Sequence, residues 1–229
     1  MSRYAISDIH GCARSFEALL DKVGLAANDE LYLLGDYIDR GPDSRGVIDR
    51  IRALQQAGQP VTCLMGNHEQ MLLRSRMDLR WYRTWMLNGG RATLESFEVQ
   101  TTSEIPEDYT EWLVGLAHYC ETPDYFMVHA GLDFRQENPL EDTMGMLWSR
   151  DWHDHIDRDW LGGRAIVHGH TPQTRDQLVT NLQKMDQQAW INIDGGCVFG
   201  QLQGFGQLCA FDLDKQTLTL QEAIEDELK

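Results

Sequence analysis

The sequence predicts an α/β fold, in one domain over residues 1–229 whose core holds two β-sheets. Over the first 70 residues, short apolar runs typical of buried strands alternate with helical patterns, the order expected of a parallel or mixed sheet covered by helices. Three runs within about the last 50 residues alternate instead like antiparallel strands. The sequence has no repeat, low-complexity tract or obvious linker, and 229 residues suit one domain with a full core.

The first half of the chain supplies strand and helix patterns in turn. The expected elements are a strand over 4–7, a helix over 12–23, a strand over 30–34, a helix over 44–57 and a strand over 61–65. Gly24 and Gly58 are the expected stops of the two helices. Residues 70–112 are predicted to be mostly helical, with an irregular polar stretch at 100–108.

The second half is less regular. Two short apolar runs, 125–128 and 165–169, are typical of buried strands. Between them, a long loop rich in acidic residues, Pro and Met is expected from Gly131 to Trp148. The runs expected to be antiparallel strands are 190–193, 207–213 and 217–221.

Composition limits the classes of partner. The chain has 20 Lys and Arg against 36 Asp and Glu, and a net charge of −16 argues against nucleic acid, whose phosphates require basic residues. No apolar run approaches the roughly 20 residues that cross a bilayer, so no membrane partner is expected. The first expected strand begins three residues after Met1, which leaves no room for a signal peptide. Five cysteines without a C-x-x-C spacing indicate reduced thiols, and we expect a cytoplasmic protein. The oligomeric state stays open.

Five apolar runs end in residues that can bind a metal ion. These residues are Asp8 and His10, Asp36 and Asp39, Asn67 and His68, His129, and His170. Taken singly, each pattern has an ordinary explanation as a turn, a helix cap, a surface ion pair or a structural histidine. Because ligands in α/β folds collect beyond the carboxyl ends of strands, five such ends favour one shared site.

The residue types at these ends suit a site with two metal ions. Asp8 and His10 are one residue apart, so an extended chain points both side chains to the same side. The two oxygens of Asp36 can bridge two cations, as two-metal hydrolytic sites require. Asn67 can add an amide oxygen without adding negative charge.

The order and spacing of these motifs resemble the signature of phosphoprotein-phosphatase-type metallophosphoesterases, in particular the small bacterial and phage lambda serine/threonine protein phosphatases. The matching segments are 8–11, 35–41, 66–69, 129–131 and 169–171, and residues 193–200 resemble the terminal segment of the small members. Pro172 stands where the wider superfamily often has a further histidine, which fits this branch. The resemblance implies a four-layer α/β/β/α sandwich of the calcineurin-like type, with two mixed β-sheets flanked by helices.

The resemblance also implies two divalent metal ions at the shared edge of the sheets. It places one ion on Asp8, His10 and Asp36. It places the other on Asp36, Asn67, His129 and His170, so that Asp36 is the bridge. Ligands of oxygen and nitrogen suit Mn²⁺, which we expect, and also Fe²⁺ or Zn²⁺.

By the same resemblance, a hydroxide bridging the two metals attacks phosphorus in line. His68 then acts as the general acid that protonates the leaving alkoxide, and Asp39 orients its imidazole. Arg40 binds the phosphoryl oxygens together with Asn67. A second phosphate-binding arginine is expected within a Trp-x-Arg segment, and Arg150 matches this position.

Some assignments have alternatives. Arg158 and Arg164 lie near Arg150 in the sequence, and Arg150 can instead pair with the adjacent aspartate. His168 is expected to support the site without binding a metal. The other conspicuous side chains are His153 and His155, expected at a solvated surface, and Met71, Met77, Met86 and their neighbouring tryptophans, expected in the core or a pocket wall.

The resemblance favours a metal-dependent serine/threonine protein phosphatase that also accepts phosphotyrosine and whose partners are phosphorylated proteins or peptides. The alternative is a bis(5'-nucleosyl)-tetraphosphatase, a diadenosine polyphosphate hydrolase, because that group shares every motif. A non-catalytic metal-binding scaffold is a third hypothesis, which an intact acid–base pair disfavours. Because the chain is acidic and shows no Lys/Arg cluster outside the site, we expect a single phosphoryl group as the substrate rather than a long polyanion.

Overall fold

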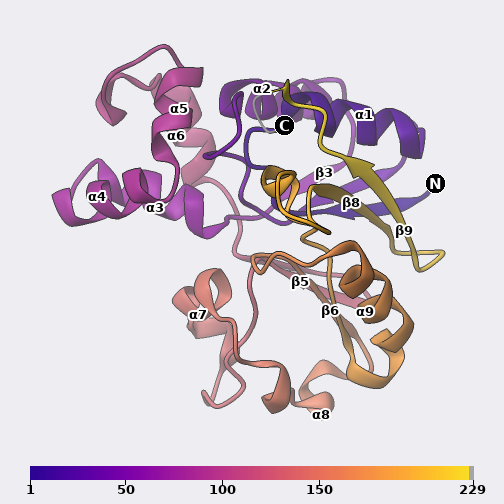
Figure 1. Cartoon of the computed structure of the whole chain (residues 1–229). Coiled ribbons are helices and arrows are strands. Elements are labelled where there is room, and N and C mark those ends of the chain that lie inside the picture. Colours follow the sequence, from indigo (N-terminus) through magenta and orange to yellow (C-terminus); the bar gives the residue numbers. More distant parts are fainter. Residues whose placement is uncertain (227–229) are drawn as a thin grey trace.

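The computed structural model describes residues 1–226, and two β-sheets form the centre of this part of the chain (Figure 1). The first sheet has the strand order β3-β2-β1-β8-β9, and the second has the order β4-β5-β6-β7. Helices cover the outer faces, so the α/β fold with two mixed sheets flanked by helices is confirmed.

The first sheet combines the two halves of the chain. Its strands are β1 (Arg3–Ile6), β2 (Glu30–Leu33), β3 (Val61–Cys63), β8 (Gln207–Asp212) and β9 (Thr217–Glu222). Strands β1, β2 and β3 are parallel, whereas β8 and β9 are antiparallel to their neighbours, as predicted. The crossovers are α1 (Ala13–Val23) and α2 (Ser44–Gln56), and Gly24 ends α1 in the left-handed conformation.

Side chains of β1 alternate between two hydrophobic cores, because successive residues of a strand point to opposite faces. Tyr4 and Ile6 belong to the core beneath α1 and α2. Ala5 belongs to the core between the sheets, where it joins Met127 and Val167 of the second sheet. This inter-sheet core joins the two sheets on which the strand-end motifs lie.

The second sheet contains β4 (Tyr119–Glu121), β5 (Tyr125–Val128), β6 (Ala165–His168) and β7 (Trp190–Asn192). Strand β7 was expected to be antiparallel, and that prediction is wrong, because β7 pairs in parallel with β6. The physical reason is the 14-residue helix α9 (Arg175–Gln188), which provides the crossover that a parallel pair requires.

The predicted helical region projects from the sheets (Figure 1). It contains α3 (Asn67–Ser75), α4 (Leu79–Leu87), α5 (Gly90–Ser96), the 3₁₀ turn η1 (Thr102–Glu104) and α6 (Glu107–Val114). The predicted irregular stretch falls around η1, as expected. Met77, expected in the core or a pocket wall, lies between α3 and α4 with 92% of its surface exposed.

The segment after Gly131 is more regular than predicted. It contains η2 (Pro139–Glu141) and the helix α7 (Thr143–Trp148), which begins where the Asp142 carboxylate accepts a hydrogen bond from Gly145 N. The remaining short elements are η3 (His153–His155), α8 (Arg158–Leu161) and η4 (Cys197–Phe199). Within residues 1–226, none of the helices combines the length and hydropathy that spanning a bilayer requires.

Candidate metal centre

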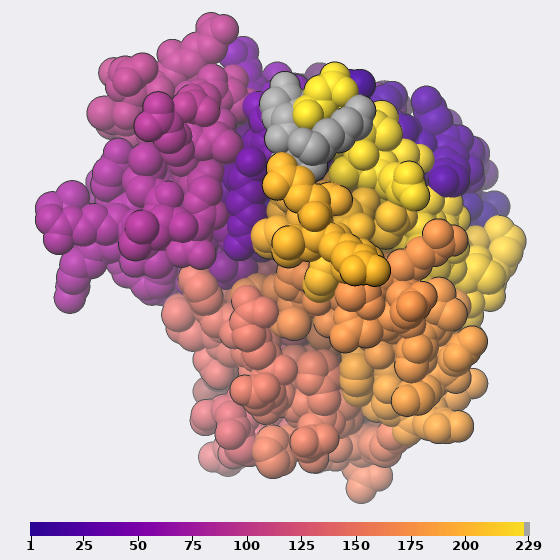
Figure 2. Space-filling model, in the orientation of Figure 1, coloured from indigo at the N-terminus to yellow at the C-terminus, as the bar shows by residue number. Residues whose placement is uncertain are grey.

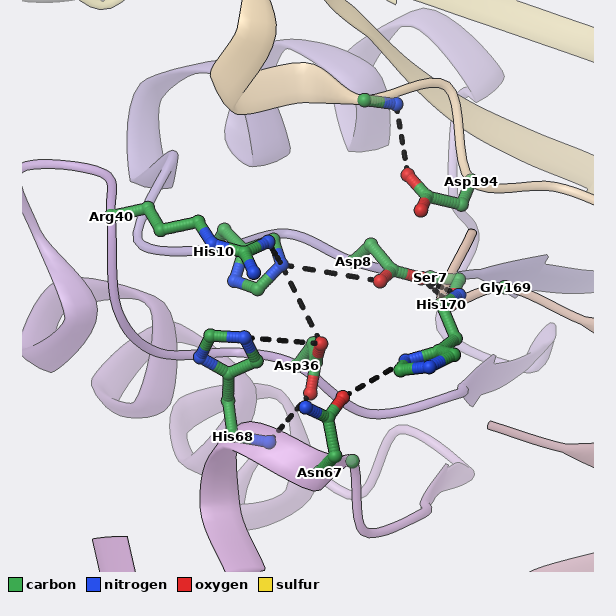
Figure 3. A network of polar contacts seen from close by, with 12 residues as sticks. Ser7, Asp8, His10, Asp36, Arg40, Asn67, His68, Gly169, His170 and Asp194 are labelled. Carbon is green, nitrogen blue, oxygen red and sulfur yellow. Dashed lines mark hydrogen bonds and ion pairs between the residues drawn. The ribbon is translucent and has the colours of Figure 1, made fainter. Parts of the chain in front are cut away.

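The five strand-end motifs meet at one edge of the two sheets. The residues that follow β1, β2, β3, β5 and β6 are, in that order, Asp8 and His10, Asp36, Asn67, His129, and His170. Within each sheet these strands are parallel, so their carboxyl ends lie on the same side. Figure 3 shows the side chains of His10, His68 and Asn67 gathered around Asp36.

Much of the site backbone is in the left-handed region. Nine non-glycine residues among residues 1–226 have positive φ, and six of them belong to the predicted site: Asp8, His10, Asp36, Asp39, Arg40 and His170. This conformation costs a non-glycine residue roughly 1–3 kcal/mol and persists only where the surroundings fix it. Here hydrogen bonds between the loops do so, since His10 N donates to Asp36 O at 2.8 Å.

Two glycines allow the loops to approach the carboxylates. A Cβ atom at Gly66 would lie 2.1 Å from Asp36 Oδ1, and one at Gly169 would lie 2.1 Å from Asp8 Oδ2. Neither distance is compatible with a side chain. The glycines of the third and fifth motifs are therefore needed for close backbone approach to the acidic residues.

Asp36 lies at the centre of the site. Its Oδ2 atom is 3.5 Å from His10 Nε2, 3.5 Å from His129 Nε2 and 3.9 Å from His68 Nε2. Its Oδ1 atom accepts a hydrogen bond from His68 N at 3.0 Å, which fixes the carboxylate plane. One carboxylate is thus shared between imidazoles from both sheets.

The tautomers of His10 and His129 are set by backbone carbonyls. Nδ1 of His10 lies 2.8 Å from Ile38 O, and Nδ1 of His129 lies 2.8 Å from Leu34 O. A carbonyl only accepts hydrogen bonds, so each Nδ1 carries the proton and each Nε2 presents a lone pair to Asp36. Two lone pairs facing a carboxylate oxygen repel it unless a cation lies among them.

The side-chain oxygen of Asn67 also lies close to imidazole nitrogens. Its Oδ1 atom is 3.0 Å from His129 Nε2 and 3.0 Å from His170 Nδ1. His129 Nε2 carries no proton in the tautomer just described, so an oxygen and a nitrogen lone pair face each other. The remaining ring nitrogen of His170, Nε2, is buried without a hydrogen-bond partner in the part of the chain that the structure describes. These donor atoms fit a metal ion.

Asp8 is held so that one oxygen faces the site. Its Oδ2 atom accepts hydrogen bonds from His170 N at 3.0 Å and from the Ser7 hydroxyl. Its Oδ1 atom is left 4.0 Å from His10 Nε2. Asp8 therefore links the first sheet to the loop of the second sheet through its own side chain.

Burial sets the protonation states that metal binding needs. Burial lowers the pKa of His10 well below its usual value, which favours the neutral imidazole that binds metals. Burial and the nearby Asp8 raise the pKa of Asp36, so its ionised form needs positive charge close by. Two groups of candidate ligand atoms share Asp36, one with His10 and His68 and the other with His129 and His170. Within each group the ligand atoms lie within 4.8 Å of one another.

His68 differs from the other members of these groups, because it is also paired with Asp39. Nδ1 of His68 lies 2.6 Å from Asp39 Oδ2, and both side chains are buried. Asp39 also accepts hydrogen bonds from Trp85 Nε1, at 3.0 and 2.8 Å to its two oxygens, and from Thr93 Oγ1 at 2.6 Å. Burial raises the pKa of Asp39 to about 7, although the bonds from Thr93 and Trp85 oppose that rise.

Arg40 and Arg150 lie on different sides of the ligands. Arg40 Nη1 is 2.7 Å from His10 Nε2, and its guanidinium stands 5.7 Å from the centre of the Phe199 ring. Arg150 donates to Thr171 Oγ1 at 3.0 Å, beside His170. The two alternatives to Arg150, Arg158 and Arg164, lie elsewhere. Arg158 donates a hydrogen bond to Gln187 O, and Arg164 donates one to Glu121.

Two further residues shape the site, Glu69 and Asp194, and the sequence assigned no role to either. Glu69 accepts hydrogen bonds from Asp36 N, Tyr37 N and Gly66 N at 2.8–2.9 Å, which ties the second and third motifs together. Burial raises the pKa of Glu69 to about 8. Asp194, which is buried, accepts from Gly196 N at 2.8 Å and approaches Asp8 (Figure 3). The only sequence signals were the positions of Glu69 and Asp194 inside matching motifs.

The outer histidines differ in part from expectation. His168 lies outside both groups of candidate ligand atoms, and its Nε2 is 3.2 Å from His153 Nε2. The prediction of a solvated His153 is wrong, because its ring stacks on Trp152 at 4.2 Å between centres and is half-buried. His155 is exposed, as expected. The ring of Trp190, from the distant strand β7, also lies 4.2 Å from the His153 ring, so the burial of His153 could not be read from the polar local sequence.

A family model described as calcineurin-like phosphoesterase matches residues 1–191. The chain belongs to this family. The family implies a dinuclear divalent metal centre, which agrees with the two groups of donor atoms that share Asp36.

Relatives in sequence carry a more specific name. The chain is 34% identical over 134 residues to a symmetrical bis(5'-nucleosyl)-tetraphosphatase of Nitrosomonas europaea, over 58% of this chain and 45% of the relative. It is 32% identical over 135 residues to the enzyme of that name from Pseudomonas fluorescens, over 58% and 43%. The match therefore spans about half the length of these relatives.

Solved structures support the fold. One described as a candidate diadenosine tetraphosphatase matches with a TM-score of 0.67 and 23% identity, covering 97% of this chain and 93% of that chain. A protein serine/threonine phosphatase from Saccharomyces cerevisiae matches with a TM-score of 0.71 and 17% identity, covering 98% and 81%. At these identities the similarity shows the fold alone.

The comparisons correct one prediction from the sequence. A serine/threonine protein phosphatase was favoured, yet the relatives above are named for a dinucleoside tetraphosphate. The predicted protein-phosphatase activity is therefore wrong, and the alternative is the better-supported hypothesis. The motifs did not discriminate because both groups share them.

Proposed function

We propose that this chain is a metal-dependent hydrolase of dinucleoside tetraphosphates, which cleaves the central phosphoanhydride to give two nucleoside diphosphates. The observation that carries this proposal is the name shared by the sequence relatives, symmetrical bis(5'-nucleosyl)-tetraphosphatase. The buried cluster around Asp36 supports it, since its donor atoms fit the metals that such a hydrolysis would use. Pro172 supports placing the chain in the phosphoprotein-phosphatase-type branch of the family.

The proposed ligands follow the sequence assignment. Asp8, His10 and Asp36 would hold one ion, and Asp36, Asn67, His129 and His170 would hold the other. When bound, two divalent cations, for which we propose Mn²⁺, would lower the pKa of a water and neutralise phosphate charge. Asp8 and Asp36 contribute the fixed negative charge, and the carbonyl-bonded His10 and His129 contribute oriented neutral imidazoles.

The arginines would bind the phosphate chain. Arg40 and Arg150 approach the ligands from different sides, beside His10 and His170 respectively. A planar guanidinium can make two parallel hydrogen bonds to phosphoryl oxygens, which orients the phosphorus for in-line attack. In this proposal Arg40 exchanges its contact with His10 for a contact with substrate.

His68 would donate the proton to the leaving phosphate. Its Nε2 atom faces the space beside Asp36 Oδ2 at 3.9 Å, while Asp39 holds Nδ1. A positioned general acid typically contributes roughly 10²–10⁴-fold to a rate. A phosphate leaving group is less basic than an alkoxide, so the contribution to anhydride cleavage should be toward the lower end.

The local charge also supports a polyanionic substrate and corrects the expectation drawn from net charge. Between residues 71 and 94 there is one acidic residue, and the arginines are Arg74, Arg76, Arg80, Arg83 and Arg91. These lie in the segment from α3 to α5, whose Trp85 holds Asp39 at the site. A local field decides how an anion is attracted, so the total charge of −16 is a poor guide here.

The test is a product analysis with Mn²⁺-loaded protein. Diadenosine tetraphosphate and a phosphoserine peptide are offered together at matched concentrations, with Asp36→Asn as the inactive control. We expect preferential consumption of the dinucleotide and ADP as the single nucleotide product. Formation of AMP with ATP, or preferential release of phosphate from the peptide, would refute this proposal.

A further inference from the structure

A hollow lies between the projecting helices and the second sheet, outside the cluster around Asp36. Its volume is about 350 Å³, and it is lined by Arg80, Trp81, Thr84, Met144 and Trp148. Trp81 and Thr84 lie on α4, and Met144 and Trp148 lie on α7. In Figure 2 the outline of the molecule is notched where the magenta α3–α4 segment meets the salmon segment that contains α7. We call this hollow the tryptophan cleft.

One wall of the tryptophan cleft lies beside the proposed metal centre. The ring of Trp148 lies 6.4 Å from the ring of His170 and 6.3 Å from the ring of Trp81. The Trp148 indole is held by a 2.9 Å hydrogen bond from its Nε1 to Gln70 Oε1 on α3. A ligand whose phosphates reach the metals can therefore extend directly over these rings.

The rim of the cleft is basic. The guanidinium of Arg74 stacks 4.8 Å from the centre of the Trp81 ring and donates to Met144 Sδ at 3.6 Å. The Arg80 side chain is 89% exposed and pairs with Asp78. Two half-buried aromatic faces beside arginines suit a ligand that has both a flat π-system and negative charge.

We propose that the tryptophan cleft binds the nucleobase of one half of the substrate, with the base stacked against Trp81 and Trp148. The inference rests on the proposed function, because it requires a nucleotide whose phosphates lie at the metals. The occupant is argued from the charge of the rim, from the contact with His170, and from the apolar lining. Stacking tolerates every base, so the cleft should accept adenine and other bases alike.

Trp81 is the residue to change, because it lines the cleft but contacts neither a proposed metal ligand nor the His68–Asp39 pair. Trp81→Ala should raise KM for diadenosine tetraphosphate by roughly 5- to 150-fold, the range that stacking on an aromatic side chain contributes. Trp81→Phe keeps an aromatic face and should recover most of that loss. The kcat for p-nitrophenyl phosphate should stay within about twofold, which shows that the metal centre is intact.

Tyr82→Ala is the matched control. Tyr82 is the next residue on α4 and is also half-buried, but it lines a different hollow with Met86 and Leu94. Its replacement should leave KM for the dinucleotide unchanged. An equal rise in KM for Tyr82→Ala and Trp81→Ala would show that the loss comes from a distorted α4, and it would overturn the assignment.

A second measurement separates the cleft from the proposed reaction. Inhibition of p-nitrophenyl phosphate hydrolysis is compared for ADP and for pyrophosphate, which has the phosphates without the nucleoside. ADP should bind more tightly than pyrophosphate to the unchanged protein, and Trp81→Ala should remove this difference. If the dinucleotide is not hydrolysed but the difference is present and lost in Trp81→Ala, the proposed function fails and the cleft assignment stands. Equal inhibition by ADP and pyrophosphate in the unchanged protein would overturn the cleft assignment.

Discussion

The hydrogen bond from Trp85 to Asp39 provides a direct test of how the proposed general acid is positioned. The indole N–H lies 3.0 and 2.8 Å from the two Asp39 oxygens, and Asp39 in turn lies 2.6 Å from His68 Nδ1. Trp85→Phe removes this single donor and keeps an aromatic ring in the core. Trp85 touches none of the proposed metal ligands through this bond, so metal content should be retained.

The size of the effect follows from the charge of the acceptor. A hydrogen bond to an ionised group contributes about 1.5–3 kcal/mol, and about 1.4 kcal/mol is tenfold in a rate or equilibrium. If the whole loss falls on the proton-transfer step, kcat drops by roughly 10- to 150-fold. The bond from Thr93 Oγ1 to Asp39 remains, so the lower part of this range is expected.

The pH profile gives a second readout whose sign is fixed. Burial raises the pKa of Asp39 to about 7, and the bond from Trp85 opposes that rise. Removing the bond raises the pKa further, so ionised Asp39 is lost at a higher pH as the solution is acidified. The acidic limb of the kcat profile for Trp85→Phe should therefore move to higher pH.

Trp112→Phe is the matched control for this substitution. Trp112 lies on α6, and its indole Nε1 donates a 3.3 Å hydrogen bond to Gln55 Oε1, a neutral acceptor. Activity and pH profile should be unchanged in this variant. A Trp85→Phe enzyme with full metal content, unchanged kcat and an unmoved acidic limb would refute the role assigned to Trp85 and Asp39.

Three further changes test the metal centre and the acid. Chelation should abolish activity and lower Tm, and Mn²⁺ should restore both. Asp36→Asn should reduce the content of both metals in elemental analysis, and loss of one ion alone would contradict the shared bridge. His68→Asn should lower kcat by roughly 10²–10⁴-fold for an alkyl phosphate and by less for p-nitrophenyl phosphate, with metal retained; equal losses would point instead to misplaced substrate. Gly169→Ala should weaken metal binding because the new Cβ meets Asp8, whereas Gly115→Ala, whose Cβ would have no neighbour nearer than 3.5 Å, should not.

The ligand set could be predicted because each candidate is local to a strand end. Asp36 and His129 are far apart in sequence, yet each directly follows a short apolar run, and parallel strands bring such ends together. The predicted direction of β7 was wrong because a local pattern does not identify the neighbouring strand. The alternation of residues 190–193 indicates a strand but not its partner, and the length of α9 decides that β7 runs parallel to β6.

The surroundings of the ligands could not be predicted in the same way. Trp85 is 46 residues from Asp39, and no periodic pattern connects an indole to a carboxylate at that separation. The contact between Trp81 and Trp148 likewise joins two helices through their packing, and one of those helices was expected to be a loop. The expectation of a single phosphoryl group, drawn from the net charge, failed for a different reason. The net charge of the whole chain does not show that arginines are concentrated in the segment from α3 to α5.

The strained loops and the lone pairs of the site have one physical explanation. Six site residues lie in the left-handed region, each at a cost of roughly 1–3 kcal/mol. The side chains positioned there include the carboxylates of Asp8 and Asp36 and the imidazole of His10, which repel one another when they stand alone. A shared cation turns that repulsion into attraction, so ion binding and folding of these loops are linked. The strain is therefore expected where the ligands must converge, and the same convergence makes metal affinity sensitive to any change that moves the loops.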